Sequence, residues 1–412
     1  MSESNGHLTL DDPRVGTATP ALEEALGVIR LLADDIGPRR PCSDAEKRAA
    51  TELVAWLRRR GVEARTEPFR GYSTFAKPYA LLFGASLAGG LLQRTGHARA
   101  GTALALGSAI AGALEGDLRH TPVSDALSTE PSVYVWGHVP AAGPARRRVC
   151  LCGHLDTSRS GAVFHPKVVP HLSNLLQSPA VSATLLAAGA LVMRAPGGRA
   201  LHTGALAGMA FSLAMVAERE LRGEDVPGAS DNASGAAIAM QIAAECAASP
   251  LRHTEVDVLI TSCEESGMLG AQAYARQQRR RAAESTFINF DTLGGPAPLT
   301  YILREGSATV NRPASERLIG LLESIAKRRP DLGLTPARTT PGLPTDATPM
   351  RARGWEAVTL LAQGKTIPNY HWPTDTYENV DPLTVGRALE AGRELLLALD
   401  AEVTRPATSP SG

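Results

Sequence analysis

Two histidines and several carboxylates follow apolar, strand-like segments, and these residues are the ones best suited to chemistry. The segment Arg148–Cys152 leads into Gly153-His154-Leu155-Asp156, which places a histidine and an aspartate on the same side of an extended chain. Asp156 is therefore placed to accept the second ring N–H of His154, as the partners of metal-bound histidines do. Taken alone, however, the pair fits a buried structural histidine better than a metal ligand.

Further candidate ligands stand after strand-like segments or at the start of a predicted helix: Asp231, the pair Glu264 and Glu265, Asp291, and His371. Each has a simpler interpretation by itself. Asp231 lies in a loop of small residues that opens a helix, where an aspartate is more often a helix cap. Adjacent acids such as Glu264 and Glu265 are usually just solvated, yet one of them could bind a metal while the other acts as a base.

Together these positions predict a metal site. Two histidines and three carboxylates at the ends of strands in one sheet are improbable as independent accidents. Nitrogen and oxygen ligands without a thiolate suit zinc, with cobalt or manganese as alternatives. Five ligands are too many for one catalytic zinc, so with one bridging carboxylate they predict two ions, roughly 3.5–4 Å apart.

The same motifs, in the same order, resemble those of the co-catalytic di-zinc aminopeptidases. They are His154-Leu-Asp156, Ser230-Asp-Asn-Ala-Ser-Gly235, Glu264-Glu265, Asn289-Phe-Asp291 and His371-x-x-x-Asp375. This family includes bacterial leucyl aminopeptidases and aminopeptidase Y, with glutaminyl cyclases and glutamate carboxypeptidases as relatives. Flanking segments match as well: Gly37-Pro-Arg39, Thr345-Asp-Ala347 and Glu378-Asn-Val-Asp381.

The resemblance implies a role for each metal ligand. Asp231 would bridge two zinc ions. His154 and Asp291 would complete one site, and Glu265 and His371 would complete the other.

The resemblance also implies which residues take part in catalysis. Glu264 would take a proton from a metal-activated water that attacks the scissile carbonyl, and would then protonate the leaving amine. Asp156 would lie behind His154 and orient it. A cis peptide bond between Asp231 and Asn232 is a further feature that the family often has.

The elements that position these residues alternate between strand and helix. Strands are expected at Val62–Phe69, Val133–Trp136, Arg148–Cys152, Val256–Ile260, Phe287–Phe290, Tyr301–Leu303 and Val358–Leu361. Helices are expected near residues 22–36 and 43–60, and at Ala233–Ala247, Leu269–Gln278, Glu316–Arg328 and Leu383–Leu399. This alternation predicts an α/β fold, a three-layer αβα sandwich with a mixed, mostly parallel sheet. The resemblance implies the phosphorylase/hydrolase-like fold of zinc peptidases.

Two stretches, residues 72–128 and 158–226, interrupt this pattern with long uncharged runs rich in Ala, Gly and Leu. Each contains two runs joined by a short basic link, so we expect two inserted hydrophobic helical hairpins. They would serve as a soluble cap or dimer face, or would associate with a membrane. Most runs are at or below the roughly 20 residues that span a bilayer, which favours the cap or dimer face. The second insertion starts and ends beside the candidate ligands, so we expect it to restrict substrate access as a lid.

Composition limits the possible binding partners and the cellular location of the protein. The chain has 42 Lys and Arg against 42 Asp and Glu, and this zero net charge argues against a nucleic-acid partner. Its five cysteines include no CxxC pair and are interpreted as reduced packing residues. No secretory signal is visible, so we expect a cytoplasmic protein, with membrane association as the alternative. We expect one catalytic domain over residues 20–403, with flexible tails at 1–19 and 404–412.

The function predicted is that of a zinc-dependent metallopeptidase, specifically an aminopeptidase, which hydrolyses a peptide or amide bond. A glutaminyl-cyclase-like acyltransferase is the nearest alternative, because the resemblance implies the same fold and an equivalent acid for it. A small-metabolite amidohydrolase is another. A catalytically silent scaffold is less favoured, since neither a ligand nor the base is missing. The sequence leaves the substrate side chain and the oligomeric state open.

Overall fold

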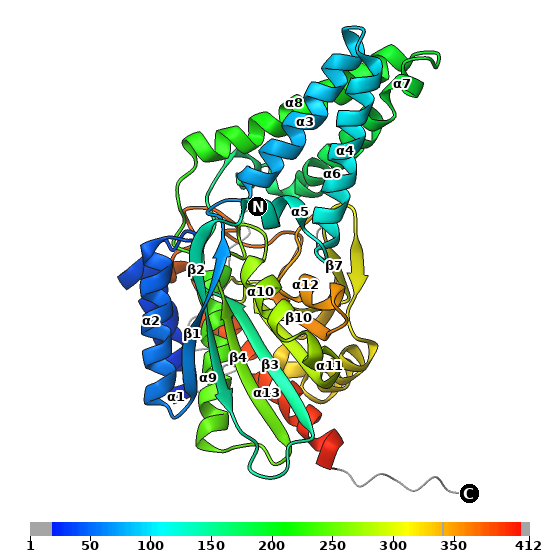
Figure 1. Ribbon diagram of the computed structural model, residues 1–412. Helices are drawn as coiled ribbons and strands as arrows, with labels where there is room; N and C mark the ends of the chain where they lie inside the picture. The colour runs from blue at the N-terminus through cyan, green and yellow to red at the C-terminus, as the bar shows by residue number, and fades with distance from the viewer. Residues whose placement is uncertain (1–18, 340–341, 405–412) are drawn as a thin grey trace, which may run out of the picture.

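The computed structural model describes residues 19–339 and 342–404. The tails expected to be flexible lie outside these residues, apart from Thr19 and Thr404. Most of the chain surrounds one sheet of eight strands, in the spatial order β1-β2-β4-β3-β5-β10-β6-β9 (Figure 1). The strands are β1 Glu63–Gly71, β2 Glu130–Val139, β3 Arg147–His154, β4 Thr254–Thr261, β5 Ser285–Asp291, β6 Leu299–Ile302, β9 Thr335–Ala337 and β10 Glu356–Ala362.

The sheet is mixed, and its centre is parallel. Strands β4, β3, β5 and β10 run parallel to one another. The pairs β1–β2 and β2–β4 at one edge, and β10–β6 toward the other, are antiparallel. The central strands are continuous apolar runs because helices cover both of their faces. Every residue of β3 from Val149 to His154 is buried. A separate two-stranded sheet joins β7 Arg304–Gly306 to β8 Asn311–Pro313.

Helices cover the two faces and complete the predicted three layers. One core contains the apolar sides of α1 Pro20–Arg30, α2 Asp44–Arg59, α9 Gly235–Ala248, α11 Glu316–Arg328 and α13 Pro382–Thr404. The opposite core contains α10 Leu269–Gln277 and α12 Ala347–Ala352, together with Cys150 and Cys152 of β3. Short helical turns complete this part: η1 Leu31–Ile36, η4 Ala229–Ser234, η5 Arg279–Glu284, η6 Pro330–Leu332 and η7 Tyr377–Asn379. All five cysteines are free, as expected.

The start of α2 has one of the two contacts of the capping box that Ser43 and Glu46 could form. The Ser43 hydroxyl accepts the Glu46 N–H at 3.1 Å, as a capping serine should. The Glu46 carboxylate, however, accepts the Cys42 N–H at 3.0 Å and the Ser132 hydroxyl at 2.8 Å. The acid therefore turns into the protein, toward β2, instead of closing the box on the helix.

The two apolar insertions form helical hairpins, and the hairpins pack together as one bundle that projects from the sandwich (Figure 1). The first hairpin is α3 Ala76–Arg94 and α4 Ala98–Asp117, followed by α5 Pro122–Leu127. The second is α6 Leu172–Ala187 with the short α7 Gly189–Val192, returning through α8 Gly198–Arg222; η2 Ala162–Phe164 and η3 Val169–His171 precede it. We call α3, α4, α6, α7 and α8 the bundle.

The bundle grows from the carboxyl end of the sheet. Strand β3 ends at His154, and the second insertion leaves the sheet a few residues later. The two ends of that insertion pair with each other, because Ser160 N–H donates to Glu224 O at 2.8 Å and Val226 N–H donates to Ser158 O at 3.1 Å. In open α/β sheets ligands bind at this edge, so any site there lies at the foot of the bundle.

Candidate metal centre

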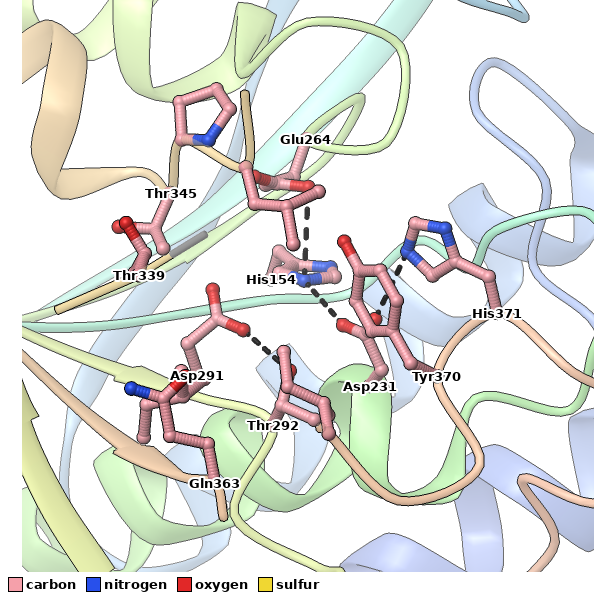
Figure 2. A pocket seen from close by; sticks show the side chains of 14 residues that line it. His154, Asp231, Glu264, Asp291, Thr292, Thr339, Thr345, Gln363, Tyr370 and His371 are labelled. Atoms are coloured by element: carbon pink, nitrogen blue, oxygen red, sulfur yellow. Dashed lines mark hydrogen bonds and ion pairs between the residues drawn. The ribbon is translucent and has the colours of Figure 1, made fainter. Parts of the chain in front are cut away.

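His154 and Asp231 meet where β3 ends and η4 begins. His154 Nε2 lies 3.2 Å from Asp231 Oδ1, and both side chains are at least 95% buried. On the other side of the aspartate, His371 Nε2 lies 3.2 Å from Asp231 Oδ2 (Figure 2). Each oxygen of Asp231 therefore faces a different histidine, which is the arrangement that a bridging carboxylate needs.

The remaining predicted ligands complete two groups around Asp231. One consists of His154, Asp231 and Asp291, and the other of Asp231, Glu265 and His371; within each group the ligand atoms lie within 4.8 Å of one another. These are the two sets that the sequence predicted. A third combination, His154 with Glu264 and Glu265, meets the same distance criterion. The cis peptide bond between Asp231 and Asn232 is also present, as expected.

The residues fit a metal of the zinc type. The groups offer imidazole nitrogens and carboxylate oxygens, which are the donors that catalytic zinc sites use. Within the described part of the chain, the buried His371 Nδ1 and Glu265 Oε1 have no hydrogen-bond partner. Glu265 Oε1 lies 3.2 Å from His371 Nε2. A buried carboxylate oxygen without a hydrogen bond costs free energy, which a cation would recover.

The electrostatics of the centre are those of buried carboxylates that face imidazoles. Burial opposes ionisation of Asp231, but hydrogen bonds from His154 and His371 outweigh it and hold the pKa of this carboxyl well below its usual range. Burial likewise opposes protonation of His371, yet Glu265 and Asp231 raise its pKa to about 9. Burial raises the pKa of Asp291 to about 6, against the opposing effect of His154. A divalent cation would replace these protons as the partner of the carboxylates.

Asp156 supports the centre by a different contact from the one predicted. The ring N–H at His154 Nδ1 faces the backbone carbonyl of Asp156 at 3.1 Å, whereas the Asp156 carboxylate oxygen is 3.7 Å away. That carboxylate instead accepts the backbone N–H groups of Glu264 at 3.1 Å and Glu265 at 3.0 Å. The chain turns after β3 and brings the carbonyl closer than the side chain. Asp156 thus fixes the segment that carries both glutamates.

Glu264 lies beside the two ligand groups and lines the pocket in front of them (Figure 2). Its Oε2 is 3.9 Å from His154 Nε2, and 12% of its side chain is exposed. Burial raises the pKa of Glu264 well above its usual value, although the nearby His154 opposes the shift. A carboxylate of raised pKa that borders a pocket suits a general base that must later return its proton.

Two supporting residues lie in the motifs that flank the ligands, but their contacts could not be read from the sequence. Asp375 accepts the backbone N–H groups of Ser230 at 2.7 Å and Asp231 at 3.0 Å, and so fixes the start of η4. Arg39 is fully buried. Its guanidinium donates to five backbone carbonyls, those of Leu32, Gly37, Leu155, Pro227 and Gly228. Arg39 therefore ties the loop after His154 to the loop before Asp231.

Three residues beside the centre have left-handed backbones although none of them is glycine. They are Cys263, Thr292 and His371, with φ of 57°, 49° and 49°. Cys263 precedes the glutamate pair, and Thr292 follows Asp291. Such conformations cost free energy and gather at functional sites, because they aim side chains that regular backbone could not.

The pocket in front of the centre is small. Its empty space, including the open mouth, is about 410 Å³. Beyond the ligands and Glu264 its described lining is uncharged: Thr292, Thr339, Leu343, Pro344, Thr345, Leu361, Gln363, Ile367 and Tyr370. None of these lining residues comes from either insertion. The second insertion reaches the centre through η2, where the Phe164 ring packs 4.4 Å from that of His371, and through α8, where Arg219 and Glu220 line a second pocket together with Glu265. The expectation that the second insertion restricts substrate access as a lid stays a prediction.

Comparison with known proteins agrees with this geometry. Residues 212–396 match the family model of peptidase family M28. This segment contains Asp231, Glu264, Glu265, Asp291 and His371. A search of curated proteins gives no match.

Solved structures share the fold. A zinc aminopeptidase from Bacillus subtilis is 13% identical with a TM-score of 0.55, covering 92% of this chain and 95% of its own. A glutaminyl cyclase from Porphyromonas gingivalis is 13% identical with a TM-score of 0.55, covering 92% and 98%. A Zn-dependent exopeptidase from Parabacteroides distasonis is 13% identical with a TM-score of 0.54, covering 92% and 97%. At these identities the likeness is one of fold. The segment 212–396 is thus similar to peptidase family M28, and this match supports a zinc-dependent peptidase, a hydrolase.

Proposed function

We propose that the chain is an aminopeptidase that uses two zinc ions, one held by His154, Asp231 and Asp291 and the other by Asp231, Glu265 and His371. The observation that carries the proposal is the shared Asp231, whose two oxygens face two different histidines at 3.2 Å. Cobalt or manganese could occupy the same donors. No ligand and no base is missing from the set, which argues against a catalytically silent scaffold.

Different side chains take part in different steps of peptide hydrolysis. Bound zinc lowers the pKa of a water molecule and polarises a carbonyl oxygen. Glu264 accepts the proton of the attacking water and delivers it to the leaving amine nitrogen. Asp156 and Asp375 hold the backbone that carries Glu264, Glu265 and Asp231, so the carboxylates keep their positions while the proton moves.

The small pocket supports cleavage at a chain end. Space of about 410 Å³ accommodates one side chain better than an extended polypeptide. The lining mixes aliphatic side chains such as Leu343 and Ile367 with hydroxyl and amide groups such as Thr339 and Gln363. Because no described lining residue beyond the centre is charged, we propose an uncharged N-terminal residue as the preferred substrate.

A turnover assay with the zinc-loaded chain tests this function. The panel consists of a Leu-Gly dipeptide with a free amine, the same dipeptide acetylated at its amine, and a peptide with N-terminal Gln. We expect release of free leucine from the first substrate, with at least a tenfold lower rate on the acetylated one. Bound zinc, measured by mass spectrometry, should approach two ions per chain.

Two other activities would appear in the same assay. The glutaminyl cyclase fold neighbour makes an acyl transfer the specific alternative, and this would give a pyroglutamyl peptide and ammonia from N-terminal Gln. A small-metabolite amidohydrolase would cleave the acetyl group and leave the dipeptide intact. Either product in place of free leucine would overturn the aminopeptidase.

A further inference from the structure

The bundle exposes large hydrophobic side chains that the rest of the protein does not. Among the described residues, every large hydrophobic side chain that is strongly exposed lies on the bundle, except Leu397 of α13. All parts of the bundle contribute: Leu81 of α3, Ile110 of α4, Val181 of α6, Leu191 of α7 and Phe211 of α8 are 56%, 54%, 59%, 71% and 48% exposed. The apolar surface therefore surrounds the bundle and is not confined to one face.

The interior of the bundle combines a small apolar cluster, Ala105, Leu186, Ala205 and Met209, with small and polar residues at the helix contacts. Gly89 and Gly101 allow α3 and α4 to touch, since a Cβ on Gly89 would lie 2.8 Å from backbone atoms of α4. Ser86 and Ser108 bond to each other across these helices at 3.2 Å. A water-soluble bundle would place polar side chains on its outer surface, where this bundle exposes large apolar ones. Small residues at helix contacts and hydrogen bonds between helices are typical of bundles in lipid.

Gln93 and His202 form further polar contacts inside the bundle, near its far end. Gln93 is buried and donates to the Leu186 carbonyl at 2.9 Å, and its side-chain oxygen faces His202 Nε2 at 2.8 Å. His202 is fully buried. Three helices are thus joined by polar contacts within the bundle, while their outer sides remain apolar.

Charged residues stand only at the two ends of the bundle. Residues 78–93, 100–114, 168–193 and 200–217 contain no Asp, Glu, Lys or Arg. At the far tip Arg94, Arg99, Arg194 and Arg199 are exposed, and no acidic residue accompanies them. At the foot, ion pairs join the bundle to the sandwich, Lys77 with Glu130 and Asp117 with Arg312.

Three helices of the bundle are about as long as the hydrocarbon layer of a bilayer is thick, and their uncharged stretches are somewhat shorter. Helices α3, α4 and α8 have 19, 20 and 25 residues. At 1.5 Å per residue they are about 29 to 38 Å long, against a hydrocarbon thickness of about 30 Å. Within the described chain, α8 alone is long and apolar enough by its own composition to cross a membrane, and only 22% of its most apolar stretch is buried. A core helix of a soluble protein would be mostly buried.

We propose that the bundle is embedded in a lipid bilayer, with the arginine tip at the headgroups of the far leaflet and the sandwich at the near surface. The four arginines, none of which has an acidic partner among the described residues, complement anionic headgroups. A second copy of the chain would cover one face, whereas the exposed side chains lie on every helix. Because the bundle starts at the carboxyl end of the sheet, the metal centre then lies on the side of the sandwich that faces the membrane.

Flotation of the full-length chain tests the proposal. The chain is purified in mild detergent, reconstituted into vesicles of phosphatidylcholine and phosphatidylglycerol at 3:1, and centrifuged through a sucrose gradient. We expect it to float with the vesicles at high salt and to remain bound after washing with alkaline carbonate. The double variant Leu106→Glu with Ile110→Glu, both exposed on α4, should reduce the bound fraction at least tenfold, because acids within the hydrocarbon are costly.

Leu397→Glu is the matched control, since Leu397 is 57% exposed but lies on the sandwich, and it should float like the unmodified chain. A chain that is monodisperse without detergent and does not float would overturn the proposal. So would a detergent-free dimer that the α4 double variant dissociates, because the faces would then bind a second copy. Release by carbonate would also overturn it by indicating a peripheral contact. If the double variant fails to fold, flotation and carbonate resistance of the unmodified chain decide the matter.

Discussion

At the scale of single residues, the centre depends on where each carboxylate oxygen points. Asp231 turns its two oxygens to two histidines, and Asp156 turns its oxygens to two backbone N–H groups. Both are buried aspartates beside the same histidine, yet one is free to bind metal and the other is fully used in holding the chain. Glu264 belongs to neither of the two ligand groups around Asp231. It borders the pocket, and is therefore available for proton transfer.

Replacing Glu264 by Gln should abolish most turnover while leaving the metal in place. The amide retains the shape but cannot accept a proton, and a positioned general base contributes about 10²- to 10⁴-fold to the rate. Turnover measured under substrate saturation should fall by at least 10²-fold, with zinc content unchanged by mass spectrometry. Glu52→Gln, on the exposed side of α2, is the matched control and should retain full turnover. Near-normal turnover of the Glu264 variant would remove this residue from the mechanism.

At the scale of elements, the segments that carry the centre are held by buried polar side chains from distant parts of the chain. Arg39 joins the loops after β3 and before η4, and Asp375 holds the start of η4. Glu46 of α2 reaches toward the segment before the glutamates, where the Cys263 thiol lies 3.6 Å from its carboxylate. These contacts fix the irregular loops to one another and to the sheet that they leave.

Glu46 should make the stability of the fold depend on pH. Burial, with Asp156 nearby, raises the pKa of Glu46 to about 8, above its ordinary value of 4.5. The folded chain therefore keeps a proton that the unfolded chain releases, and this stabilisation is complete below pH 4.5 and is lost as the pH rises through 8. Between these limits the free energy of unfolding should fall relative to that of Glu46→Gln by about 1.4 kcal/mol per pH unit at most.

Urea unfolding at pH 5, 6, 7 and 8, with saturating zinc, measures this difference. The Gln variant keeps an acceptor for the Cys42 N–H and the Ser132 hydroxyl, so it should fold. Glu52→Gln in the same helix should follow the unmodified chain at every pH. Parallel profiles for the unmodified chain and Glu46→Gln would contradict a protonated Glu46.

At the scale of the whole molecule, the sandwich and the bundle differ in where they place large apolar side chains. The sandwich buries apolar strands such as β3 between two helical layers. The bundle buries serine, glutamine and histidine beside a small apolar cluster, and it exposes leucine, isoleucine and phenylalanine. One chain thus contains a part suited to water and a part suited to lipid, joined at the edge of the sheet that carries the metal centre.

Removal of the metal should destabilise the sandwich. Several buried carboxylates and two histidines converge at the centre, and a cation that binds only the folded chain stabilises it by about 2.7 kcal/mol at a hundredfold excess over Kd. Chelation should lower the thermal midpoint, and added zinc should restore it. The variant Asp231→Asn should lose this zinc response, whereas Glu52→Gln should keep it. An equal midpoint with and without zinc would mean that the centre does not bind the ion in the folded state.

The sequence predicted the α/β sandwich and indicated the candidate ligands because both depend on local signals. Apolar runs ended by acids or histidine mark the central strands, and each predicted strand lies in or overlaps an observed one. The predicted helix Glu316–Arg328 matches α11 at both ends, where Ser315 caps its first turn. Three-residue strands such as β7, β8 and β9 carry too few residues for a pattern, and they were not predicted.

Only the tertiary structure decided how distant residues meet. It showed that Asp156 orients His154 by its carbonyl and not by its carboxylate, and that Arg39 gathers carbonyls more than a hundred positions away. The tertiary structure also showed that the two hairpins form one bundle, and which of their side chains are exposed and which are buried. Composition alone does not determine either. Sequence determines which side chains are available and which segments are regular. Distances between segments, and which face of a helix is exposed, follow from packing of the whole chain.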